Sequence, residues 1–189
     1  VHFIAISNGV DSDRRESAEF APFLNIMNEW YVRDTSRKIT TVLKARGMSG
    51  KAHTNNRCCY GYKKDENNPE QWVIDEEAAE VVRRIFAMCM GGKGPYQIAR
   101  ALAEEEIERP EYYLGTRGRG VNTKSFDEEH PYAWRGTTVK EILKRPEYTG
   151  CTVNFRTKKE SYKDKRPVKV DKAEWIIFEN TQEPIIDKH

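Results

Sequence analysis

Residues 75–107, DEEAAEVVRRIFAMCMGGKGPYQIARALAEEEI, carry the pattern that decides the fold. Asp75 stands where a helix cap is expected, and acidic residues follow it in the first turn. Gly91 and Gly92 would end this helix, and Pro95 suits the first turn of a second one. The stretch therefore predicts two helices joined by the turn GGKG, a helix-turn-helix candidate. The apolar positions that recur at helical spacing in the first helix are Ala79, Val82, Ile85, Phe86 and Cys89.

A third helical segment is expected at residues 135–145, within AWRGTTVKEILKRPEYTG. Thr137 or Thr138 would cap it and Pro146 would end it. Around these helices, residues 60–75 predict a hairpin that turns at Asn-Asn-Pro. YTGCTVNFRTKK and AEWIIFEN predict two strands, and residues 108–132 are expected to be irregular. The buried side of the third helix would hold Val139, Ile142 and Leu143.

The N-terminal part predicts a strand at Val1–Ser7 and a long helix over residues 19–46. Pro22 would lie in its first turn, and Gly47 would stop it. Residues 48–59, rich in Gly, Ser, Asn and basic side chains, predict a linker. The fold class expected is α+β and mostly helical: a long N-terminal helix, a linker, and a helix-turn-helix-like domain with small hairpins. The apolar stripe of the long helix comprises Phe20, Phe23, Leu24, Met27, Tyr31, Ile39, Val42 and Leu43.

Composition excludes several classes of function. No run of about 18 apolar residues exists, so no membrane span is expected, and no secretory leader is expected either. The four cysteines form no Cys-x-x-Cys pair, so neither zinc nor a disulfide framework is expected, and we predict free thiols in the cytoplasm. The four histidines are scattered, and neither a phosphate loop nor a nucleophile elbow occurs. We therefore assign no catalytic residue, metal ligand or cofactor.

Charge is unevenly distributed although the net charge is only +2. Arg33–Lys64 holds nine Lys/Arg and one acid, and Arg135–Lys169 holds eleven against four. One cluster in a linker and one around a helix-turn-helix favour binding of double-stranded DNA. Two alternatives stay open: Thr138 is more often only a cap, and Lys144 with Arg145 would also suit a helix C-terminus. The candidate DNA-binding residues of the second cluster are Arg135, Thr137, Thr138, Lys140, Lys144 and Arg145.

Three stretches together resemble the large serine recombinases, of the conjugative-transposon or phage-integrase kind within the resolvase/invertase superfamily. EFAPFLNIMNEWYVRDTSRKITTVLKARGMSGK is similar to the long helix that ends their catalytic domain. YGYKKDENNPEQWVIDEEAAEVVRRIFAMCMGGKGPYQIARAL resembles the start of their recombinase domain, and WRGTTVKEILKRPEYTG a later part of it. The resemblance covers roughly Val1 to Phe155 and is specific in its order.

The resemblance implies strand exchange through a covalent phosphoserine link. The family's nucleophile would lie before Val1 and its zinc ribbon beyond His189, so we expect a DNA-binding piece of a longer chain, inactive by itself. Residues 1–47 would end the catalytic domain, 48–59 form a basic linker, and 60–189 form the recombinase domain. The long helix would support self-association, and the 135–145 helix would enter a major groove. Phosphate contacts are implied for Lys44, Arg46, Lys51 and Arg57 near the minor groove, and for Arg156, Lys158 and Lys159.

Two other hypotheses remain on the sequence alone. A non-enzymatic helix-turn-helix regulator would start near Val1, so the upstream reading frame decides that hypothesis. A structural interaction module would use the Phe20–Leu43 stripe to bind a partner and would not need the basic residues.

Overall fold

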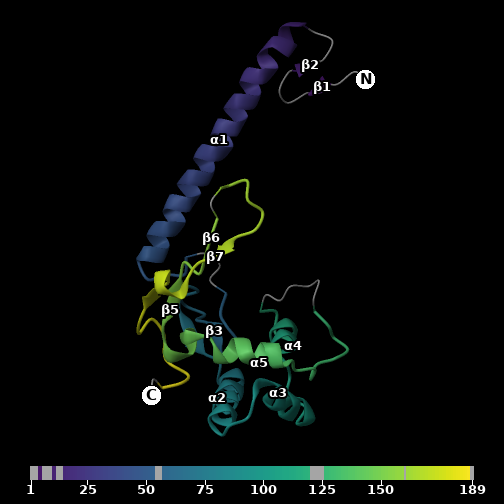
Figure 1. Cartoon of the computed structure of the whole chain (residues 1–189), viewed down its shortest axis with the longest axis vertical. Helices are drawn as coiled ribbons and strands as arrows, with labels where there is room; N and C mark the ends of the chain where they lie inside the picture. The colour runs from purple at the N-terminus through teal and green to yellow at the C-terminus, as the bar shows by residue number, and fades with distance from the viewer. Residues whose placement is uncertain are drawn as a thin grey trace.

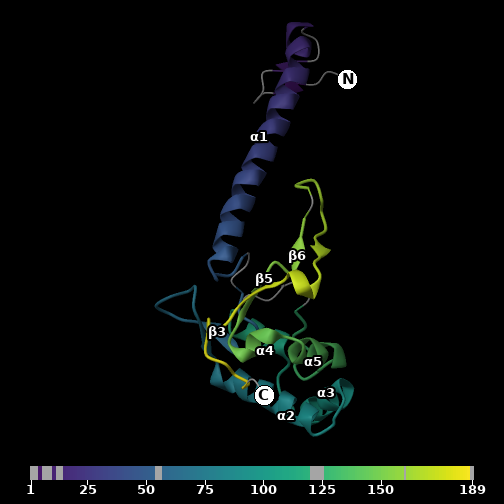
Figure 2. The same ribbon diagram turned by 60° about the vertical axis from the view of Figure 1, so that its left-hand side comes forward.

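The computed structural model describes residues 4–5, 10–11, 15–53, 57–119, 126–159 and 161–187. Within these residues the fold is mostly helical with four small two-stranded antiparallel sheets, which confirms the predicted fold class. Figure 1 shows a long helix, α1, that projects from a body containing the other helices. The same arrangement is seen after a 60° turn (Figure 2).

Helix α1 spans Arg15–Met48 and is longer than the predicted 19–46 at both ends. Pro22 therefore lies inside the helix, and its placement in the first turn was wrong, because no Gly or Pro between residues 15 and 21 interrupts the helix. Gly47 does not stop the helix either. It is buried, and a Cβ at this position would lie 2.6 Å from the Phe155 ring, so the glycine permits close packing.

The body begins with the hairpin expected around Asn-Asn-Pro. Strands β3 (Tyr62–Lys64) and β4 (Trp72–Ile74) pair antiparallel, with Tyr62 opposite Ile74. Helices α2 (Glu76–Met90) and α3 (Pro95–Glu104) follow, joined by residues 91–94 as predicted. Helix α5 (Gly136–Leu143) packs against both.

Capping differs from the expectation at two helices. Asp75 is the N-cap residue of α2, but its side chain makes no capping hydrogen bond. The N-cap of α5 is Arg135 rather than Thr137 or Thr138, again without a side-chain cap. Both threonines lie within the helix, so their hydroxyls are not placed to reach the orphan amides of the first turn.

Residues 108–132 are not wholly irregular, because Pro110–Thr116 form helix α4. Pro110 starts the helix, and Tyr113 is buried beneath it. Arg109, whose side chain is only 9% exposed, pairs with Glu111 and donates to the Asp127 carbonyl, which closes the chain around this helix.

The C-terminal part forms short strands and turns. Strand β5 (Thr152–Asn154) pairs with β8 (Ile176–Phe178), which matches the two predicted strands. Strands β6 (Thr157–Lys158) and β7 (Val168–Lys169) form a hairpin that lies beside α1 in both views (Figures 1 and 2). The remaining elements are β1 (Ile4–Ala5), β2 (Val10–Asp11), η2 (Pro146–Thr149) and η3 (Lys172–Glu174).

The hydrophobic core lies in the body and joins the hairpin, the helices and the C-terminal segment. Its fully buried large side chains are Tyr62, Val82, Ile85, Ile98, Leu102, Val139 and Tyr148. Cys59 also belongs to this core, so the segment predicted as a linker is packed at its end. By contrast, the apolar side chains of α1 are largely exposed in this chain, including Phe23, Met27, Tyr31, Ile39 and Val42.

Candidate nucleic-acid interface

Helix α5 has one buried side and one polar, exposed side. Gly136, Val139 and Ile142 face the core. Thr137, Lys140 and Lys144 are exposed and recur at steps of three and four residues, so they share one helical face. Glu141 is also exposed beside them, and Arg145 is exposed just after the helix, whereas Thr138 is half-buried. The α5 face therefore presents two lysines and a threonine to a ligand in solvent.

The N-terminus of α5 adjoins α3. A shallow groove of about 420 Å³ is lined there by Arg135, Thr137, Tyr96 and Arg100. Tyr96 is 76% exposed, and a Cβ on Gly136 would lie 2.6 Å from its ring. The sequence reasoning missed Tyr96 and Arg100, although they stand four residues apart on the solvent side of a predicted helix. Together these side chains extend the α5 face with a cation and an aromatic ring.

The second predicted group lies at the end of α1, and part of it is already paired. Arg46 donates to Glu70 at 3.0 Å, and the Lys51 ammonium lies 2.8 Å from the other oxygen of the same carboxylate. Lys51 in turn lowers the pKa of Glu70 through hydrogen bonding and its charge. Glu70 belongs to the β3–β4 turn, so these two cations fasten α1 to the hairpin. Lys44 and Arg57 are exposed.

Hydrogen bonds to one buried side chain hold the same junction together. The Asn154 side chain is buried and donates to the carbonyls of Gly47 and Lys51, at 3.0 and 2.8 Å. Its oxygen accepts from the His53 amide at 3.0 Å. Burial and the charge of Lys44 lower the pKa of His53, whose ring packs against Phe155. One asparagine of β5 thus holds the end of α1 and the segment after it.

Arg156 is half-buried and already paired within the protein. Its guanidinium lies 2.8 Å from the Glu147 carboxylate and 4.9 Å above the Trp175 ring. The Glu147 side chain is only 10% exposed, whereas the Arg156 side chain is 32% exposed, so the pair is partly shielded from solvent. Lys158, two residues further on, is exposed on β6. Of these two candidates, Lys158 is the one with a free path to a ligand.

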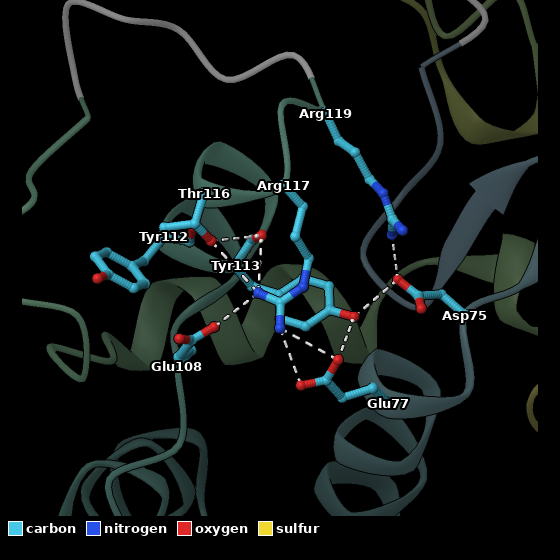
Figure 3. Close-up of polar contacts among 8 residues, drawn as sticks. All are labelled: Asp75, Glu77, Glu108, Tyr112, Tyr113, Thr116, Arg117 and Arg119. Atoms are coloured by element: carbon cyan, nitrogen blue, oxygen red, sulfur yellow. Dashed lines mark hydrogen bonds and ion pairs between the residues drawn. The ribbon is translucent and has the colours of Figure 1, made fainter.

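A dense polar network links α4 to the start of α2 (Figure 3). The Tyr113 hydroxyl donates to Asp75 and Glu77, at 3.0 and 3.1 Å, and Arg119 also pairs with Asp75. Arg117 stacks 3.7 Å from the Tyr113 ring centroid and bonds Glu77 at 3.0 Å. The Asp75 carboxylate serves this network, which explains why it does not cap α2.

The chemistry of this network is structural. Burial, followed by the hydrogen bond to Asp75, raises the pKa of Tyr113, so the phenol stays protonated and acts as a donor.

Burial similarly raises the pKa of Cys58 to about 11 and that of Cys59 to about 12. These groups are therefore poor nucleophiles at neutral pH.

Other kinds of site find little support among the described residues. They contain no group of three or more His, Cys, Asp or Glu side chains suited to a metal ion. Within the same part of the chain, no helix is long and apolar enough to cross a membrane. The arrangement that remains is two sets of cations, one on α5 and one where α1 joins the body.

Comparison with known proteins identifies a family. A family model described as Recombinase, the C-terminal domain of large serine recombinases, matches residues 76–189. The match runs from the start of α2 to the end of the chain and includes α5. Neither a curated protein nor a solved structure matches the chain.

Proposed function

Because the chain belongs to the Recombinase family of large serine recombinases, and so to site-specific DNA recombination, we propose that it recognises the DNA attachment site. The observation that carries the proposal is the α5 face, Thr137, Lys140 and Lys144, on a helix whose other side is buried against α2 and α3. A helix of this kind fits the major groove of DNA, where Arg and Lys reach base edges and phosphates.

The proposal gives the candidate residues different roles. Arg135, Thr137, Lys140, Lys144 and Arg145 contact DNA from α5. Thr138 is half-buried and supports the helix, although a hydroxyl contact with a phosphate stays a prediction. From the region around the α1 junction, Lys44, Arg57 and Lys158 contact the phosphate backbone. Three further cations are already paired with carboxylates and contact DNA only if its phosphates displace Glu70 or Glu147. These cations are Arg46, Lys51 and Arg156.

The experiment starts from a selection, since the attachment site is unknown. A library of random duplexes is enriched on the protein, and a recovered sequence is compared with its shuffled version in a gel shift at 0.15 M salt. Specific recognition predicts a preference of roughly a thousandfold or more. Equal affinity for both duplexes refutes the proposal.

The same assay separates reading of bases from attraction to phosphates. Lys140→Gln should weaken binding of the selected duplex and relax its sequence at one position. Glu141→Gln is the matched control, because Glu141 is exposed on the same helix but carries the wrong charge for DNA. Its removal should leave the selected sequence unchanged.

Self-association and catalysis are further parts of the proposal. Apolar side chains of α1 such as Ile26 and Tyr31, both 67% exposed, would pack against a second copy. Sedimentation at rising concentration tests this, and a monomer at all concentrations contradicts it. We assign strand cleavage to no serine of this chain, so a nicked duplex should yield no covalent protein–DNA adduct with it.

A further inference from the structure

A cleft of about 730 Å³ separates the lower half of α1 from the β6–β7 hairpin. The two walls come from segments more than a hundred residues apart in the sequence, and they lie side by side in both views (Figures 1 and 2). Four cationic side chains line the cleft: Arg33, Arg37, Lys44 and Lys159.

The remaining described lining is polar and uncharged. Five hydroxyl-bearing residues share the walls, three on α1 and two on the hairpin. No carboxylate is among the described lining residues. The Thr40 and Thr41 hydroxyls donate to carbonyls of α1 and the Tyr162 hydroxyl donates to Glu29, so the hydrogen bonds to phosphate oxygens would come mainly from the four cations. These hydroxyl residues are Ser36, Thr40, Thr41, Ser161 and Tyr162.

One exposed contact holds the tip of the hairpin on α1. The Lys163 ammonium lies 2.6 Å from the Glu29 carboxylate, and the Tyr162 hydroxyl donates to the same oxygen at 3.2 Å. Both charged side chains are more than half exposed. Such an exposed pair contributes little stability. The hairpin is therefore positioned beside α1 without a ligand, through a contact that DNA could displace.

We propose that α1 and the β6–β7 hairpin form a clamp for one phosphodiester strand of duplex DNA, with Arg33, Arg37, Lys44 and Lys159 as its phosphate contacts. The inference rests on the proposed function and adds the hairpin to it as a second arm. Of the two neighbouring lysines Lys158 and Lys159, only Lys159 lines the cleft, so Lys159 and not Lys158 is assigned to the clamp.

The test compares two double variants with the same change in charge. Arg37→Gln with Lys159→Gln removes one cation from each wall. Lys38→Gln with Lys169→Gln removes one from each of the same two elements, but neither residue lines the cleft. All four side chains are exposed, so both variants should fold like the wild type, which circular dichroism checks.

Affinity for the selected duplex is measured between 0.05 and 0.3 M salt. Each lost phosphate contact should reduce the slope of log K against log salt by about 0.9, so the cleft variant should lose about 1.8. Binding at 0.1 M salt should weaken by roughly tenfold per contact, while the control variant should stay within about threefold of the wild type. Equal losses in both variants overturn the clamp and leave the proposed function standing. A wild-type protein without salt-dependent binding refutes the proposed function itself.

Discussion

Replacing Asn154 with alanine should loosen the junction between α1 and the body. The substitution removes three hydrogen bonds, two donated to the carbonyls of Gly47 and Lys51 and one accepted from the His53 amide. A typical hydrogen bond contributes about 1 kcal/mol net, and a buried partner left unsatisfied costs about 1–3 kcal/mol. Because the freed segment can reach water by detaching, we expect the lower figure for each, a loss of about 3 kcal/mol.

Two measurements report this loss. A domain of this size loses about 2–4 °C in Tm per kcal/mol, so Asn154→Ala should lower Tm by about 6–12 °C. Hydrogen exchange at residues 49–53 should accelerate by at least tenfold, while amides of α2 and α3 should change less. The second measurement distinguishes a detached junction from general unfolding.

The matched control is Asn28→Ala, because Asn28 is an exposed asparagine in α1. Alanine has the higher helix propensity, so this variant should be at least as stable as the wild type. An Asn154→Ala protein with unchanged exchange at residues 49–53 would refute the reasoning. That result would mean that the ion pairs with Glu70 hold the junction without the asparagine.

Three further predictions concern the backbone, the thiols and the paired cations. Gly150→Ala should lower the free energy of unfolding by about 2 kcal/mol or more in urea titration, because φ is +80° and the new Cβ would lie 2.7 Å from a carbonyl oxygen. At pH 8 a thiol reagent should label exposed Cys89 first, since burial raises the pKa of Cys58 and Cys59 to about 11 and about 12 and keeps them protonated; fast labelling of either would contradict this. Glu70→Gln should tighten DNA binding by about threefold, because it removes a negative charge beside Arg46 and Lys51, two proposed phosphate contacts; weaker binding would show that the ion pairs are needed to shape the interface.

The helical core was predictable because its signals are local. Ala79, Val82 and Ile85 recur within one helix, and the Gly-Gly and Pro signals mark where that helix ends and the next begins. The same kind of pattern predicted α5 from Val139 and Ile142. The family match over residues 76–189 confirms the resemblance that these motifs carried.

Features that depend on distant partners were not predictable. Helix α4 has only seven residues, too few for a periodic pattern, and its anchor Tyr113 bonds to Asp75 across 38 residues. From its sequence neighbours Arg156 was predicted to be a free cation. Nothing in those neighbours indicates that it pairs with Glu147 and stacks on Trp175 in the fold. Likewise a basic side chain looks the same in sequence whether or not it lines the cleft beside α1.

The segment after α1 is held more firmly than its sequence indicated. The sequence predicted a linker at residues 48–59. In the structure Lys51 bonds to Asn154 of β5 and pairs with Glu70 of the β3–β4 turn, so this segment is held against the body. Helix α1 has 34 residues and is therefore about 50 Å long. A rotation of about 10° at the junction would move its far end by about 9 Å. A flexible linker would leave that end undefined, so the accuracy with which α1 would meet DNA or a second copy, as proposed, depends on a few hydrogen bonds at its base.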